Sequence, residues 1–117
     1  MAQRVRFHAD FRRDLAAQLT WLQQHRDDAW IERLRTGLDE AIELLSALPR
    51  VGTIEAEDDL VVLRRLILRK LPYVVWYTCN KDDPKADIWF LRLFHASQDR
   101  PQPTLMRSGR RRSSRKT

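Results

Sequence analysis

Apolar residues change their spacing near the start of the chain, and the change predicts a strand followed by a helix. Val5 and Phe7 alternate with polar neighbours, a two-residue period that is typical of a short amphipathic strand. From Asp10 onward, apolar residues recur every three or four positions, which places them on one stripe of a helix. The members of this stripe are Phe11, Leu15, Leu19 and Leu22. We interpret the stripe as a buried face rather than a site.

A second helix is predicted after Asp27, a residue that can cap a helix N-terminus. Its apolar residues also recur every three or four positions. They are Ile31, Leu34, Leu38, Ile42, Leu45 and Leu48. Pro49 ends the helix because proline has no backbone N–H with which to continue it. Since only residues 24–27 link the two helices, we expect an antiparallel hairpin.

Three strands are predicted in the second half of the chain, after an acidic loop that contains Glu55, Glu57, Asp58 and Asp59. The first strand, over residues 61–69, has two faces. One face carries Val62, Leu66 and Leu68, and the other carries Leu63, Arg65, Ile67 and Arg69.

The second strand covers residues 73–79 and is rich in β-forming residues. The third strand, residues 87–95, is apolar on both faces apart from Arg92. A strand of this kind is usually central in its sheet or covered on both sides. We expect helices on one side of it and a partner chain or a second copy on the other, in the element order β-α-α-β-β-β.

Charge is distributed unevenly along the 117 residues. The overall composition, 43% hydrophobic and 32% charged, is typical of one globular domain. The net charge of +6 resides in residues 107–117, which hold six basic residues and no acid. Without them, 16 of the 22 basic residues remain against 16 acids, so the body is formally neutral. This weakens the inference of a nucleic-acid-binding fold from overall charge. We expect a folded domain over residues 1–103 and a basic, disordered tail over residues 104–117.

Several classes of function are disfavoured by the composition. Cys79 is the only cysteine, so no intrachain disulfide and no cysteine-based zinc cluster can form. Three glycines argue against a glycine-rich phosphate loop, and no apolar run is long enough to span a membrane. We expect a cytoplasmic protein without a metal or cofactor and without membrane contact.

Four segments, in this order, carry a resemblance to a known family. They are Asp14-Leu15, Leu48-Pro49 with Gly52, residues 71–77 (LPYVVWY) and residues 94–101 (FHASQDRP). Together they resemble the RelE/ParE superfamily of toxins from bacterial type II toxin–antitoxin systems, and the ParE branch most closely. The chain departs from the family pattern at Thr53 and Gln98, where arginine is usual, and in its Arg-rich tail.

The resemblance implies an α+β fold in which a helical hairpin packs on one face of a small, mainly antiparallel sheet. ParE-like toxins are implied to inhibit DNA gyrase by binding, to be neutralised by a cognate antitoxin, and to act in growth inhibition and plasmid stabilisation. RelE-like toxins are implied to be ribosome-dependent endoribonucleases that cut mRNA. A decayed toxin that only binds its antitoxin is a further alternative. We favour the gyrase interpretation and leave open whether the chain is an enzyme.

Candidate site residues depend on the branch. In a RelE-like enzyme, His95 would act as acid or base, Arg65 would hold phosphate and Tyr77 would orient a base or proton. The wider set of binding candidates is basic: Arg64, Arg65, Arg69, Lys70, Arg92 and Arg100. The tail would add nonspecific contact with nucleic acid.

Each candidate also has a structural interpretation. His95 can be a turn residue, and Tyr77 and Trp76 can serve packing alone. The basic cluster can blunt a sheet edge, or it can receive an acidic segment of the antitoxin.

Overall fold

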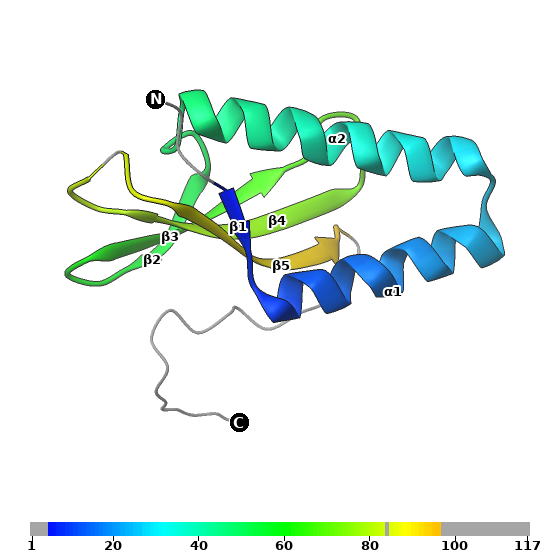
Figure 1. Ribbon diagram of the computed structural model, residues 1–117, viewed down its shortest axis with the longest axis horizontal. Coiled ribbons are helices and arrows are strands. Elements are labelled where there is room, and N and C mark those ends of the chain that lie inside the picture. The colour runs from blue at the N-terminus through cyan, green and yellow to red at the C-terminus, as the bar shows by residue number, and fades with distance from the viewer. Residues whose placement is uncertain (1–4, 84, 97–117) are drawn as a thin grey trace.

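The chain folds into two layers, a helical hairpin and a five-stranded sheet, which confirms the α+β prediction (Figure 1). The computed structural model describes residues 5–83 and 85–96; Arg100 and the predicted tail lie outside them. The elements are β1 (Val5–Phe7), α1 (Ala9–His25), α2 (Asp28–Ala47), β2 (Thr53–Glu57), β3 (Val61–Ile67), β4 (Tyr73–Asn80) and β5 (Ile88–His95). None of the described helices is long and apolar enough to cross a membrane.

The sheet has the strand order β1-β5-β4-β3-β2. Strand β1 pairs with β5 in parallel, and the other three pairings are antiparallel, as the resemblance implied. Strand β2 is an addition to the predicted order, because part of the expected acidic loop is an edge strand. Its charged residues and the register shift between Ile54 and Ala56 hide the two-residue alternation by which strands are recognised.

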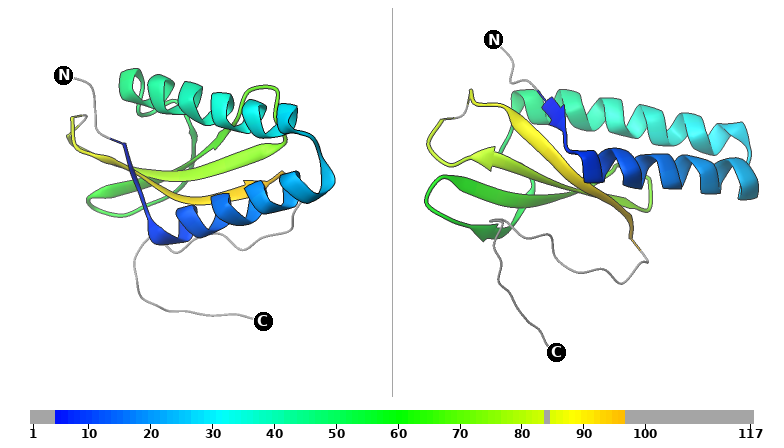
Figure 2. Two further views of the ribbon diagram at one scale, coloured as in Figure 1. Left: turned by 45° about the vertical axis from the view of Figure 1, so that its right-hand side comes forward. Right: turned by 60° about the horizontal axis from the view of Figure 1, so that its bottom comes forward.

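The predicted helical hairpin is confirmed, and both helices begin at side-chain caps. His8 Nδ1 accepts the backbone N–H of Asp10 at 3.1 Å, and Asp27 Oδ1 accepts that of Ala29 at 3.1 Å. Only residues 26–27 separate the helices. Figure 2 shows both helices on the same side of the sheet, which we call the helix face; the opposite side is the far face.

The main core lies between the helices and the helix face. Both predicted stripes contribute to it, through residues such as Phe11, Leu22, Leu34 and Leu45. Leu48 departs from the prediction: it is the C-cap of α2 and 56% exposed, so the buried stripe ends at Leu45.

A second, smaller core lies on the far face. It consists of Leu63, Val74, Trp76 and Phe94, with Ala56 and Leu91 packed against it. Strand β5 therefore has buried residues on both sides, as its two apolar faces predicted: Ile88, Phe90 and Leu93 belong to the main core and Phe94 to the second core. Trp89 is the exposed exception, at 40%. A partner chain or second copy over the far face stays a prediction.

Candidate functional site

The predicted site residues lie on both faces of the sheet. Directly paired residues in neighbouring strands point to the same face, so the register assigns each side chain to a side. Arg65 pairs with Trp76, and Trp76 pairs with Arg92, which gives a row across three strands on the far face. Tyr77 and Tyr73 belong to the main core on the helix face, and His95 pairs with Tyr73.

Arg92 is held within the chain by a helix residue. Its Nε and Nη2 donate to the two carboxylate oxygens of Asp14 at 2.7 and 3.1 Å, and Asp14 Oδ2 also accepts the backbone N–H of Leu93 at 2.9 Å. These hydrogen bonds raise the pKa of Arg92 above its ordinary value, although partial burial opposes the shift. Strand β1 pairs with β5 only as far as Phe90, so Asp14 satisfies a backbone donor beyond the end of β1.

Arg64 and Arg65 are also engaged inside the chain. Arg65 Nε lies 3.5 Å from Glu55 Oε2 on the neighbouring strand. Arg64 Nη1 donates to the carbonyl oxygens of Arg50 and Gly52 at 2.9 and 2.7 Å, and so holds the segment between α2 and β2 against β3. Both arginines therefore have a structural role.

Tyr77 is fully buried and its hydroxyl is used twice. It accepts the backbone N–H of Gly52 at 2.9 Å and donates to the carbonyl of Pro49 at 2.9 Å. Burial raises the pKa of Tyr77 to about 12, so the hydroxyl is neutral at physiological pH. A Cβ on Gly52 would lie 2.7 Å from this hydroxyl, so the glycine permits the approach.

His95 ends β5 beside the ring of Tyr73, with 5.4 Å between ring centroids in an edge-on arrangement. Strand β4 separates β5 from β3, so His95 is not on a strand next to that of Arg65. The structure therefore does not bring Arg65, Tyr77 and His95 to one point.

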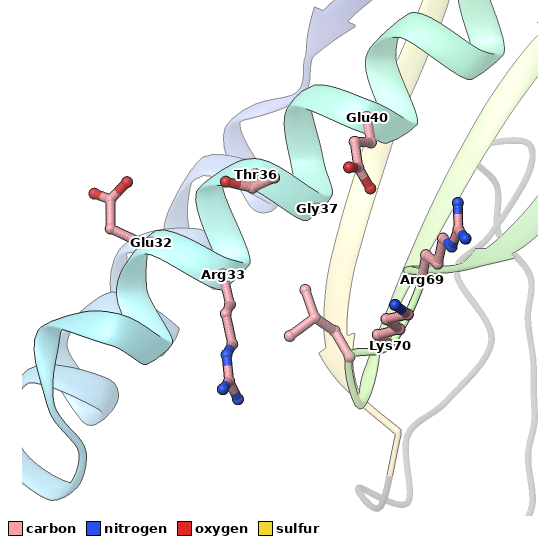
Figure 3. Close-up of a pocket in the computed structure, with 8 residues that line it drawn as sticks. Glu32, Arg33, Thr36, Gly37, Glu40, Arg69 and Lys70 are labelled. Atoms are coloured by element: carbon pink, nitrogen blue, oxygen red, sulfur yellow. The ribbon is translucent and has the colours of Figure 1, made fainter.

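Arg69 and Lys70 occupy the turn between β3 and β4, where they face α2 across a cleft. Its volume is about 530 Å³, and Figure 3 shows Arg33 of α2 on one side and Arg69 and Lys70 on the other. Gly37 lets α2 approach the turn, because a Cβ there would lie 2.6 Å from Leu71 Cδ1. The left-handed backbone of Lys70 (φ 60°) closes the turn.

Among residues 5–83 and 85–96, no group of three His, Cys, Asp or Glu residues is placed to hold a metal ion. The free thiol of Cys79 is buried in the main core. The cleft beside α2 is lined by both signs of charge, with Arg33, Arg69 and Lys70 as its cations and Glu32 and Glu40 as its acids. Its arginine and lysine side chains are suited to the recognition of anions.

Comparison with known families agrees with the fold. A family profile described as "ParE toxin of type II toxin-antitoxin system, parDE" matches residues 5–100. This chain belongs to the ParE toxin family. It is therefore a type II toxin of the ParE/RelE superfamily, as the four sequence segments indicated. A comparison with curated proteins gives no match.

Two solved structures share the fold of this ParE family member. One, the "Chromosomal ParDE TA system from P. aeruginosa", has a TM-score of 0.59 and 15% identity, covering 82% of this chain and 98% of that one. The other, an archaeal RelE-RelB complex from Pyrococcus horikoshii OT3, has a TM-score of 0.52 and 23% identity, covering 85% of this chain and all of that one. At such identities the likeness concerns the fold alone.

A cluster at the tip of the helical hairpin is absent from the sites predicted from the sequence. There the ring of His25 stacks on that of Trp21, Arg26 lies over the rings of Trp21 and Trp30, and Arg33 lies over that of Trp30. A detectable signal existed: Trp21 lies off the apolar stripe of its helix, and both tryptophans are close to arginines and to the predicted link. We call these five residues the hairpin tip.

Proposed function

We propose that this toxin inhibits DNA gyrase by binding to it, the activity that the resemblance to the ParE branch implies. The family match supports a toxin, and the arrangement of the polar side chains favours binding over catalysis. Because gyrase acts in the cytoplasm, we propose that the toxin acts there.

The observation that carries this proposal is the separation of Arg65, Tyr77 and His95. Cleavage of RNA through its 2′-hydroxyl requires a proton acceptor, a proton donor and a cation around one phosphate. Here Arg65 belongs to the far face, whereas Tyr77 and His95 belong to the helix face. The Tyr77 hydroxyl is also occupied by Gly52 and Pro49. A binding activity needs none of these three groups to converge.

We further propose that a cognate antitoxin covers the groove between the two helices. The groove has a volume of about 510 Å³ and is lined by apolar residues of both helices, including Leu15, Leu19, Leu38 and Ile42. Leu15, Leu19 and Ile42 are only partly buried, so an amphipathic segment of another chain could bury them further. The two solved structures, titled as a ParDE system and a RelE-RelB complex, support the expectation of such a partner.

The experiment compares two activities of the same full-length toxin, purified from its antitoxin complex. DNA supercoiling by gyrase is measured against toxin concentration, and the 5′ ends of mRNA are mapped on translating ribosomes with and without toxin. We expect inhibition of supercoiling and intact mRNA.

Two results would contradict the proposal. Cuts within codons together with normal supercoiling would identify a RelE-like ribonuclease. No effect in either assay, with antitoxin binding retained, would identify a decayed toxin.

A further inference from the structure

The hairpin tip is an ordered stack of aromatic rings and cations. The rings of Trp21 and His25 are stacked with 4.6 Å between centroids and an interplanar angle of 17°. Arg26 Cζ lies 5.5 Å from the centroid of Trp21 and 5.6 Å from that of Trp30, so it bridges the two helices. Arg33 Cζ lies 5.0 Å from the centroid of Trp30. The stack thus joins the last turn of α1 to the first turns of α2.

The tip is accessible to another molecule. The hairpin extends beyond the end of the sheet, at the right of Figure 1. The large ring of Trp21 remains 44% exposed in spite of its stacking partners. Trp and Arg are the residues most enriched among those that dominate protein–protein binding energy, and an exposed cluster of both is a feature that folding alone does not require.

The cations at this end of the molecule lack carboxylate partners among the described residues. Arg6, Arg13, Arg65, Lys81 and Arg92 each lie within 4.0 Å of an Asp or Glu oxygen. No such pair exists in the described part of the chain for Arg26, Arg33, Arg69 or Lys70. Figure 3 shows Arg33 on one side of the cleft and Arg69 and Lys70 on the other. Glu32 points away from the cleft, whereas the carboxylate of Glu40 points into it on the side of Arg69.

A guanidinium that is already stacked on a ring loses less conformational freedom when it binds an anion. The stacked Arg33 is therefore preorganised to donate from its N–H edge into the cleft. The cations on both sides of the cleft would attract a carboxylate of a partner. Trp30, over which Arg33 lies, offers apolar area beside it.

We propose that the hairpin tip and the adjoining cleft are the surface by which the toxin docks on its protein target, at a site that presents carboxylates beside apolar side chains. This inference rests on the proposed function, since the target is then gyrase. Two observations favour a protein over nucleic acid. Asp27, Asp28 and Glu32 flank the tip and would repel the closely spaced phosphates of a nucleic acid more than a single carboxylate placed at the cleft. The rings of Trp21 and Trp30 already have stacking partners, which leaves less ring face for bases.

The test uses two tip variants of the full chain, Arg33→Glu and Trp21→Ala, in the gyrase supercoiling assay. The matched control is Arg13→Glu, which makes the same charge change on an exposed residue at the opposite end of α1. We expect each tip variant to raise the half-inhibitory concentration by about 30-fold or more, the loss typical of a residue that dominates an interface. Arg13→Glu should behave like the wild type, and all variants should still bind the antitoxin.

The outcomes separate this inference from the proposed function. If the wild-type toxin does not inhibit gyrase, both the proposed function and the docking surface are contradicted. If the tip variants inhibit gyrase with the half-inhibitory concentration of the wild type, only the docking surface is contradicted. The docking surface would also be contradicted if the tip variants lost only their binding to the antitoxin. The same holds if they lost only their binding to a fluorescent single-stranded DNA.

If circular dichroism shows that Arg33→Glu is unfolded, Arg33→Lys replaces it. Lysine keeps the charge but lacks the planar fork, so an intermediate loss of inhibition is expected. Wild-type inhibition by a folded Arg33→Lys, combined with wild-type inhibition by Trp21→Ala, would contradict the inference.

Discussion

Two arginines of this toxin lie over aromatic rings in regions with opposite properties. Arg92 lies where α1 meets β5, with its Cζ 4.7 Å from the centroid of Phe94, and Asp14 receives its donors. Arg33 lies at the hairpin tip, with its Cζ 5.0 Å from the centroid of Trp30, and no described carboxylate pairs with it. The first arginine completes the fold, whereas the second is ordered but keeps its donors for another molecule. The partner of a cation, rather than its residue type, distinguishes a structural role from recognition.

The largest effect should follow from removing the anchor of Arg92. In Asp14→Ala, Arg92 and the backbone N–H of Leu93 lose their acceptor in a partly buried place. We expect the free energy of unfolding to fall by about 2–3 kcal/mol, the range for hydrogen bonds to charged groups. Urea unfolding monitored by tryptophan fluorescence measures the change.

The control for this prediction is Asp10→Ala on the same helix. Asp10 pairs with Arg13, but this pair is exposed, and such pairs contribute at most about 1 kcal/mol. Equal losses in the two variants would show that the contact of Asp14 with β5 is not special.

The buried hydroxyl of Tyr77, like the guanidinium of Arg92, makes its hydrogen bonds inside the chain. In Tyr77→Phe, the backbone groups of Gly52 and Pro49 lose their partner, and we expect a loss of about 1–2 kcal/mol at pH 7. Urea unfolding at pH 7 tests this value, and an unchanged midpoint would contradict it.

The same hydroxyl predicts a dependence on alkaline pH. Its pKa is about 12 in the folded state against an ordinary value of 10.0, so the unfolded chain loses its proton first. The resulting contribution to stability, up to about 2 kcal/mol, is present below pH 10 and is lost as pH rises toward 12. The difference in stability between wild type and Tyr77→Phe should therefore shrink over this interval. A constant difference would mean that Tyr77 titrates normally.

At the hairpin tip, a truncation should affect stability much less. Arg33→Ala removes a stacking contact with Trp30 but no ion pair, and exposed contacts of this kind are worth about 0.5–1 kcal/mol. Urea unfolding of Arg33→Ala beside Asp14→Ala makes the comparison direct. A loss at the tip as large as that at Asp14 would assign Arg33 to the fold.

The smallest effect is expected for His95 on the inhibition of gyrase. His95→Ala should keep a half-inhibitory concentration close to that of the wild type, because no proton transfer is required of the ring. In a ribonuclease, the same change would lower the cleavage rate by about 10²–10⁴-fold. Antitoxin binding by the variant serves as the control for folding.

Sequence periodicity predicted most of the fold because burial dictates spacing. The stripes that contain Phe11 and Leu34 gave the helices, and the two apolar faces of residues 87–95 gave a strand buried on both sides. Strand β2 was missed because an edge strand with glutamates at alternate positions buries little, so hydrophobicity does not mark it.

The candidate site was less predictable than the fold. Charge alone placed five basic residues in one group: Arg64, Arg65, Arg92, Arg69 and Lys70. In the structure the first three are held at different places, Arg65 by Glu55, Arg92 by Asp14 and Arg64 by backbone carbonyls. Such contacts join residues up to 78 positions apart, a separation that no local pattern encodes. The hairpin tip was overlooked because stacking depends on where side chains lie around two helices.

Hydrogen exchange of the full-length toxin, alone and bound to gyrase, tests the contrast between the two regions most directly. Helix ends and turns open more readily than core strands, so protection by a partner is readily detected there. We predict slower amide exchange at residues 20–34 and 68–72 in the complex, with unchanged exchange in β5. Protection elsewhere on the chain, with none at the hairpin tip, would contradict the assignment of this surface to the target.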